Sequence, residues 1–246
     1  MKPKNMRYPF LDTYRGVVMV LMILFHLWWD MVYLFDYSLP FFRPPFSHIL
    51  QRFICISFIG LSGFCFQFMK QPQKRGGLIF LCGWILTVGS FIFVPEFPNI
   101  FGVLTFIGSA IFLTIPLHHL LKNCKKRSSQ MGFLLSFCMF LLLYNVNRGE
   151  IMGIPLPSSL YEKGYFFTYL GFLDYRFTSS DYFSILPWIF IFWMGYFLHH
   201  LFLDAIVKYE KLMAIDVPFL SLLGRHSLSI YMVHQPILYA FLSLIS

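Results

Sequence analysis

Residues 11–30 read LDTYRGVVMVLMILFHLWWD, and this stretch decides the fold. The run is mostly apolar and has the length of about 20 residues that a helix needs to cross a hydrocarbon core. Four ionisable side chains interrupt it: Asp12, Arg15, His26 and Asp30. On a helix these four side chains share one stripe. Because lipid cannot satisfy such groups, that stripe is expected to face the interior of a helix bundle or a water-filled cavity.

The composition of the whole chain agrees with a membrane protein. The 246 residues are 58% hydrophobic and only 12% charged, which excludes an ordinary soluble domain. The net charge of +8 would suggest a nucleic-acid partner in a soluble protein. Here the basic residues lie in short connections between apolar runs, so they are interpreted as topology signals, with membrane lipid as a partner and no nucleic acid.

Seven apolar runs are long enough to span a membrane, and they predict an all-α, polytopic transmembrane helix bundle with a single domain over residues 1–246. The runs cover residues 14–35, 48–69, 77–95, 100–121, 131–147, 183–203 and 220–244. With the N-terminus in the cytoplasm, only five of the 19 basic residues fall outside, namely Arg43, Arg52, Arg148, Lys163 and Arg176. This asymmetry predicts a cytoplasmic N-terminus and an outer C-terminus. The basic N-terminal segment resembles a signal peptide, but the long run that follows it indicates a retained first helix.

Neither a metal site nor a bound cofactor is expected. The five cysteines have no zinc-type spacing, and they are interpreted as small buried hydrophobic residues. The long connection 148–181 is rich in Gly, Pro and Tyr. It is expected outside the membrane, either as a binding element or lid or as a plain surface loop.

His26 and Asp30 suggest catalysis within the first helix. A carboxylate four residues after a histidine can accept a hydrogen bond from one ring nitrogen, which makes the other nitrogen a better general base. Alternatively, His26 bonds to another helix and Asp30 lies in the outer headgroup region. Arg15 precedes His26 by eleven residues, about 16 Å along a helix, and would lie at the cytoplasmic mouth.

The last run, LLGRHSLSIYMVHQPILYAFLSLIS, has a similar arrangement. Arg225 marks its cytoplasmic end, and Pro236 suggests a kink beside a cavity. One stripe contains Ser227, Tyr231 and His234, and His234 comes to a depth similar to that of His26. The two histidines could line one tunnel, or His234 and Gln235 could simply join helices.

Three further residues are candidates for substrate contact, and each has a structural alternative. Asp181 could face a cavity but is expected to cap the sixth helix, which begins SSDYFSILPW and includes Trp188. His48, at the start of the second helix, could contact an outer substrate, although a cap or interfacial position is the plainer interpretation.

Four stretches together resemble a known family: LDTYRGVVMVLMILFH, FGVLTFIGSAIFL, SSDYFSILPWIFIFWMGYFL and LLGRHSLSIYMVHQP. They are similar to bacterial membrane proteins grouped with the catalytic domain of heparan-alpha-glucosaminide N-acetyltransferase. The first helix also resembles the wider superfamily of transmembrane acyltransferases, many of which have an Arg, ten residues and then a His, here Arg15 and His26. This resemblance implies that the Arg lies toward cytoplasmic acyl-CoA and that the His serves acyl transfer.

The resemblance also has a departure. The lysosomal enzyme of the family has its key His in the outer loop after the first helix, and it lacks a His at the position of His26. In roughly that region this chain has His48, in the different context FFRPPFSHIL. The chain is also shorter than the lysosomal enzyme, so heparan itself is a poor guess for the substrate.

The sequence therefore predicts a membrane acyltransferase that moves an acetyl group from cytoplasmic acetyl-CoA, as co-substrate, to an amine or hydroxyl of an outer sugar or glycolipid. His26 would be the general base or a transient acyl carrier, oriented by Asp30. Asp12, Arg15 and Arg225 would lie at the acyl-CoA end. The alternative is a non-enzymatic transport, channel or sensor protein that uses the same buried groups. The resemblance implies a bacterial plasma membrane, and the oligomeric state stays open, a homo-oligomer included.

Overall fold

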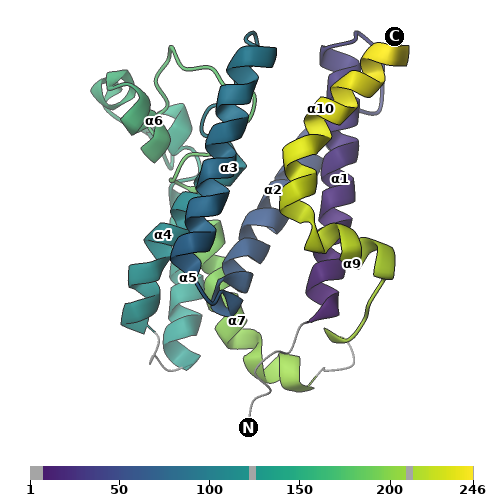
Figure 1. Ribbon diagram of the computed structural model, residues 1–246. Coiled ribbons are helices and arrows are strands. Elements are labelled where there is room, and N and C mark those ends of the chain that lie inside the picture. Colours follow the sequence, from purple (N-terminus) through teal and green to yellow (C-terminus); the bar gives the residue numbers. More distant parts are fainter. Residues whose placement is uncertain (1–7, 122–125, 209–212, 246) are drawn as a thin grey trace. The chain divides into compact units, whose positions relative to one another are not determined.

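The computed structural model describes residues 8–121, 126–208 and 213–245, and these residues are mostly helical (Figure 1). Within them, six helices are long and apolar enough to cross a membrane, and a shorter apolar helix covers Trp188–Phe202. The predicted all-α polytopic fold is confirmed. The six long helices are α1 (Pro9–Tyr33), α2 (Phe46–Cys65), α3 (Pro72–Phe93), α4 (Val103–Leu121), α5 (Lys126–Leu142) and α10 (Ser227–Ile245). The shorter apolar stretch belongs to α7 (Trp188–Lys208).

Two predicted helix boundaries are wrong in an informative way. The sixth run was expected to be helical from residue 183, but α7 begins at Trp188. Pro187 disfavours helical backbone at the residue before it. The Ser184 hydroxyl also donates a hydrogen bond to the carbonyl of Leu186, which holds this segment in a non-helical path.

The last run forms two helices instead of one. The short helix α9 covers Pro218–Arg225, and α10 starts at Ser227 after a break at His226. Figure 1 shows the two as separate rods joined by a bend. Pro236, which suggested a kink, lies inside α10. The irregular backbone therefore falls at the predicted cytoplasmic end of the run rather than at its middle.

The chain divides by its internal contacts into two compact units. Unit 1 comprises residues 1–58 and 203–246, and unit 2 comprises residues 59–202. The residues that were predicted to act in the first and last helices all belong to unit 1.

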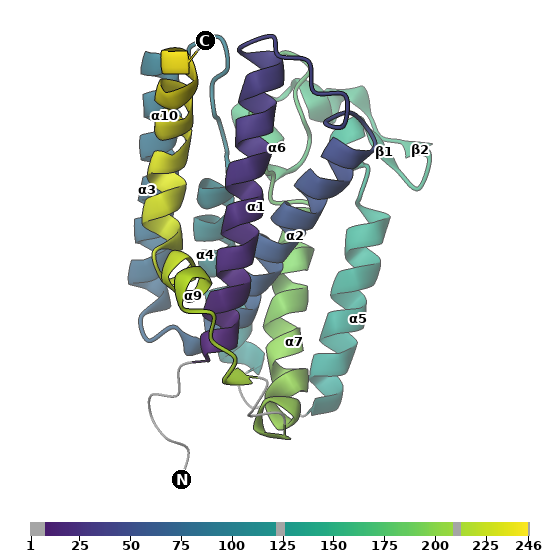
Figure 2. The same ribbon diagram turned by 90° about the vertical axis from the view of Figure 1, so that its right-hand side faces the viewer.

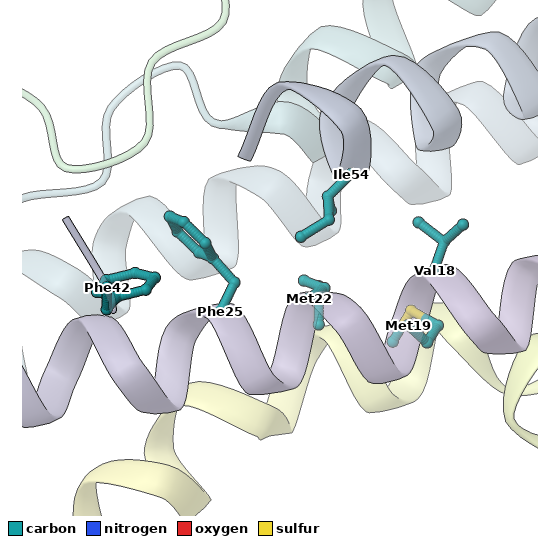
Figure 3. Close-up of a cluster of buried hydrophobic side chains, with 6 residues drawn as sticks. All are labelled: Val18, Met19, Met22, Phe25, Phe42 and Ile54. Carbon is teal, nitrogen blue, oxygen red and sulfur yellow. The ribbon is translucent and has the colours of Figure 1, made fainter. Parts of the chain in front are cut away.

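A buried apolar cluster lies along α1 in unit 1 (Figure 3). Its members come from α1, α2 and the connection between them, and they are Val18, Met19, Met22, Phe25, Phe42 and Ile54. Met19 and Met22 share the stripe of α1 that carries the ionisable residues, and Asp12 and Asp30 are buried as well. The prediction that this stripe faces the protein interior is thus confirmed.

The N-terminal half of α1 and α9 pack with their backbones in contact. A Cβ atom built on Gly16 would lie 1.9 Å from the backbone oxygen of Leu220, and one built on Gly224 would lie 1.9 Å from that of Asp12. No larger residue fits at either position without moving a helix. Small residues at a helix interface permit this close approach, as in many membrane proteins.

Glycines also allow close helix packing in unit 2. A Cβ atom on Gly63 of α2 would lie 1.9 Å from the backbone oxygen of Phe192 of α7, and Gly195 of α7 approaches Gly60 equally closely. Between α3 and α4, Gly83 leaves space for the side chain of Thr105. The interior of unit 2 therefore also depends on glycines at helix crossings.

The connection from α5 to α7 is ordered and folded. It contains the short β1–β2 hairpin (Glu150–Ile151 and Ile154–Pro155, visible in Figure 2), three 3₁₀ or α-helical turns, and a non-helical return to Trp188. The turns are η2 (Val146–Arg148), η3 (Ser158–Glu162) and α6 (Tyr165–Leu170). Partly buried hydrogen bonds stabilise this connection: Tyr182 donates to the carbonyl of Thr168 (2.5 Å), and Tyr161 donates to that of Val146 (2.5 Å).

Asp181 caps a helix, but not the helix that was predicted. Its Oδ2 accepts a hydrogen bond from the backbone N–H of Val103, the first residue of α4, at 3.3 Å. The sequence could not reveal this, because the capped helix lies about 80 residues earlier in the chain. The cysteines also differ from expectation: Cys55, Cys65 and Cys82 are partly exposed and Cys138 is exposed, so none of these four is a buried core residue.

A pH effect is expected in the α5–α7 connection. Asp174 accepts hydrogen bonds from the backbone N–H and the guanidinium of Arg176 and from the backbone N–H of Gly164, and these bonds lower the pKa of its carboxyl below the ordinary 3.8. Since the folded pKa is the lower one, the stabilisation is complete above the ordinary value and disappears as the pH falls through the folded value.

Hydrogen exchange of residues 164–177 should therefore be unchanged between about pH 7 and pH 5 after correction for intrinsic rates, and should accelerate below about pH 4. In Arg176→Gln the acceleration should begin at a higher pH than in the wild type. Equal onset in the two proteins would contradict the assignment of this effect to Asp174.

Candidate active site

Two histidines from α1 and α10 face each other in unit 1. The ring centroids of His26 and His234 are 5.0 Å apart, with 57° between the ring planes. His234 is buried, and His26 is partly buried. The expectation that the first and last helices place their inner histidines at similar depth agrees with this geometry.

His234 is held in one orientation by its own helix. Its Nδ1 lies 2.7 Å from the backbone carbonyl oxygen of Tyr231, and because a carbonyl can only accept, Nδ1 carries the proton. In the neutral ring the lone pair is then on Nε2. That atom is buried and has no hydrogen-bond partner among the described residues. A basic nitrogen is therefore free to accept a proton.

Asp30 and Gln235 form a second buried pair one turn further along α1. Gln235 Nε2 donates a hydrogen bond to Asp30 Oδ1 at 2.8 Å, and Asp30 is completely buried. Asp30 Oδ2 and Gln235 Oε1 are also buried, and within the described parts of the chain neither has a partner. Together with His234 Nε2, three orphaned polar atoms lie in one region of unit 1. Native structures rarely leave such atoms unsatisfied unless a functional reason exists.

The pairing within this group differs from the predicted one. Asp30 was expected to orient His26, but its hydrogen bond goes to Gln235. The ring of His26 turns toward His234, and it makes no hydrogen bond to any described residue. The orienting hydrogen bond that a general base needs is found on His234 instead.

A charged cluster lies nearer the start of α1. The buried carboxylate of Asp12 contacts Arg15 (3.6 Å from Nη1) and Arg225 at the end of α9 (3.7 Å from Nε). Both guanidinium groups are partly exposed. Two arginines that share one carboxylate have a net positive charge, which suits a phosphate ester.

Hydroxyl groups reinforce this end of unit 1. Thr13 Oγ1 is hydrogen-bonded to Ser221 Oγ (2.8 Å) and accepts a bond from the backbone N–H of Val217 (3.2 Å), and the Ser221 hydroxyl also donates to Asp216. The sequence does not single out these residues. Ser221 is one helical turn before Arg225, but no local pattern indicates that Thr13 and Ser221, about 200 residues apart, meet.

A comparison with protein-family models gives one match. The model described as heparan-alpha-glucosaminide N-acetyltransferase, catalytic, matches residues 7–236 of the 246. The chain belongs to this family. No curated protein and no solved structure matches the chain. Family membership and the apolar helices identify a multi-pass membrane protein of an acyltransferase family.

In this member of the heparan-alpha-glucosaminide N-acetyltransferase family, the other predicted site residues belong to several elements in both units. His48 is exposed at the start of α2, and Ser227 is the first residue of α10. Asp181 caps α4, and Trp188 packs on Phe183 in unit 2. Tyr231 belongs to the histidine group, because its carbonyl orients His234 and its ring lies 5.2 Å from the imidazole.

Metal chemistry was not expected, and the described residues hold no group of three or more His, Cys, Asp or Glu side chains that could bind a metal ion.

The Asp30–Gln235 bond gives a test of the local structure. Asp30→Asn retains an oxygen that can accept from Gln235 Nε2, so the stability should remain within about 1 kcal/mol of the wild type. Asp30→Ala leaves that donor buried and unpaired, and should destabilise the protein by about 1–3 kcal/mol. Thermal unfolding in detergent micelles measures both. If the two variants are equally stable, the bond contributes nothing.

Proposed function

We propose that the chain transfers an acetyl group from cytoplasmic acetyl-CoA to an amine or hydroxyl of an extracytoplasmic sugar or glycolipid, and that it acts in a bacterial plasma membrane. The observation that supports this most directly is the oriented His234, whose unpaired Nε2 lies beside His26 in an apolar region. Membership of the acetyltransferase family supports the reaction class.

In the proposed reaction, His234 Nε2 takes the proton from the attacking hydroxyl or amine of the acceptor. The acceptor atom bonds to the thioester carbonyl carbon, the carbon–sulfur bond breaks, and the thiolate of CoA leaves with the proton from the imidazolium. A ring N–H of His26 stabilises the carbonyl oxygen while charge develops on it. We assign the base to His234 rather than His26, because only His234 has a hydrogen bond that fixes its tautomer.

At the other end of the site, we propose that Arg15 and Arg225 bind phosphate groups of the donor, and that Asp12 holds the two guanidinium groups in position. The distance of about 16 Å along α1 between Arg15 and His26 would be spanned by the extended thiol arm of CoA.

The donor site makes a separate prediction. In Arg225→Gln the KM for acetyl-CoA should rise about tenfold, since one charge-assisted contact to phosphate is lost, while the KM for the acceptor stays unchanged. Arg148→Gln, a charge change in the α5–α7 connection, is the matched control and should leave both values as in the wild type. An equal rise of the KM for acetyl-CoA in both variants would show that the loss of positive charge anywhere on the protein causes the effect, and not a contact at Arg225.

The function itself is tested with purified protein in proteoliposomes. Acetyl-CoA with a labelled acetyl group is supplied on one side and glucosamine, as a probe acceptor, on the other. Release of CoA thiol and label on the sugar are then measured for wild type and His234→Ala. Transfer by the wild type and its loss in the variant support the proposal, and label bound to the protein would indicate an acyl-His intermediate in place of direct transfer.

If the protein neither consumes nor binds acetyl-CoA, with or without the sugar, the acetyltransferase proposal is wrong. The transport alternative rests on the same buried polar groups and predicts pH-dependent flux without any dependence on acetyl-CoA.

A further inference from the structure

The β1–β2 hairpin of unit 2 has an apolar tip that is exposed. Residues 151–157 read IMGIPLP, and no charged or polar side chain occurs among them. Met152 is 76% exposed and Ile154 is 69% exposed. On the adjoining helix α5, which is apolar enough to cross a membrane, Met131 (64%) and Leu135 (63%) are exposed to a similar degree. The hairpin therefore presents the kind of surface that membrane helices present to lipid.

Met152 is an unusual residue for its position in the turn. Ile151 pairs with Ile154, so the connection between the strands consists of Met152 and Gly153 alone. Both residues have positive φ, 50° and 80°, as the type I′ turn of a two-residue hairpin requires. Asn, Asp and Gly are the residues that suit the first of these positions, because longer side chains disfavour left-handed backbone. The geometry of the turn thus gives no reason for a methionine here, and the reason lies in what its side chain contacts.

The charged group of the hairpin is held at its base. Asn145, just after α5, donates a hydrogen bond from Nδ2 to Oε1 of Glu150 at 2.6 Å. The backbone closes at the same place, where the N–H of Leu156 donates to the carbonyl of Gly149 at 2.8 Å. The carboxylate is therefore tied to the end of α5, and the tip beyond it has no side chain that requires water.

The hairpin also lies at the level of the membrane surface. The candidate span that contains α5 runs from Arg127 to Arg148 and has 22 residues. At 1.5 Å per residue it measures about 33 Å, close to the thickness of the hydrocarbon core. The strand β1 begins two residues after Arg148. Figure 2 shows the hairpin projecting sideways beyond the upper end of α5 instead of continuing along the helix. With α5 across the membrane, the hairpin lies along the boundary between headgroups and acyl chains.

From these observations we propose that the tip of the β1–β2 hairpin inserts into the lipid leaflet at this end of α5, with phospholipid acyl chains as the partner of Met152 and Ile154. The charge distribution predicts that this is the outer leaflet. Side chains without donors or acceptors suit acyl chains, and interfacial segments bury their apolar residues at the same depth. The insertion anchors the α5–α7 connection to the membrane. It is independent of the proposed acyl transfer, in which no residue of the hairpin takes part.

The experiment introduces a tryptophan at the tip of the full chain in liposomes. Met152→Trp is reconstituted into phosphatidylcholine and into phosphatidylcholine with brominated acyl chains, since bromine quenches tryptophan on contact. The emission of the wild type, which has five native tryptophans, is subtracted. Thr178→Trp is the matched control, because Thr178 is also exposed on the α5–α7 connection but precedes the polar run SSD. Brominated lipid should reduce the added emission of Met152→Trp about twofold or more, and that of Thr178→Trp much less.

Stronger quenching of Met152→Trp than of Thr178→Trp supports insertion of the tip into lipid. If the two positions are quenched equally, or position 152 is not quenched, the proposal is wrong. Blue-shifted emission from Met152→Trp without quenching would show that protein, such as a second copy of the chain, covers the tip, and this result also overturns the proposal. If Met152→Trp unfolds at a lower temperature than the wild type, Ile154→Trp, which changes a strand residue, decides the outcome in its place.

Discussion

Replacing His234 by alanine is expected to reduce the rate of acetyl transfer by about 10²–10⁴-fold, the usual contribution of a general base. The hydrogen bond from its Nδ1 to the carbonyl of Tyr231 fixes the tautomer and leaves Nε2 as a buried acceptor, whereas His26 makes no hydrogen bond to a described residue. His234→Gln removes the base but keeps a polar side chain, so its transfer rate should fall by a similar factor. The measurement is kcat for CoA release in proteoliposomes, with thermal unfolding as a check on folding.

The same experiment distinguishes the roles of the two histidines. His26→Ala should reduce kcat by about 10–10²-fold, less than His234→Ala, if it only stabilises charge on the carbonyl oxygen. His119→Ala, which changes an exposed histidine at the end of α4, is the control and should be fully active. If His26→Ala is inactive while His234→Ala retains activity, the base is His26, as the sequence suggested.

The largest effect on stability is expected at Gly224. A Cβ atom there would lie 1.9 Å from the backbone oxygen of Asp12 and 3.1 Å from the backbone nitrogen of Gly16. Neither atom belongs to a flexible side chain, so α1 and α9 would have to separate. Gly224→Ala should therefore destabilise the protein by about 3–5 kcal/mol, in the range of severe packing defects.

A matched control is Gly89→Ala in α3. A Cβ atom at Gly89 meets nothing within 4 Å, so alanine should stabilise this helix by up to about 1 kcal/mol. Unfolding of both variants in the same detergent measures the difference. Wild-type stability of Gly224→Ala would contradict the close contact between α1 and α9.

The sequence was sufficient for the fold class because burial in lipid leaves few options for the backbone. Runs of apolar residues located the helices, and the stripe of ionisable residues identified the inner face of α1. The predicted helix boundaries are wrong at two places: before α7, where the Ser184 hydroxyl bonds to a nearby carbonyl, and at the break between α9 and α10.

The candidate active site could be predicted only in part from residue spacing. Spacing placed His26 and His234 at similar depth, but spacing also suggested that Asp30 serves His26. The partner of Asp30 is Gln235, about 200 residues away, and a contact between distant segments leaves no local pattern. The cap of α4 by Asp181 was assigned to the wrong helix for the same reason.

The hydrogen bond that orients His234 has a consequence for which substitutions this site can tolerate. The acceptor is the backbone carbonyl of Tyr231, only three residues earlier in the same helix. No substitution of a side chain removes that carbonyl, so drift elsewhere in the sequence cannot easily misalign the ring. In the proposed reaction, residues around the acceptor could therefore be exchanged while the proton-accepting nitrogen of His234 keeps its direction.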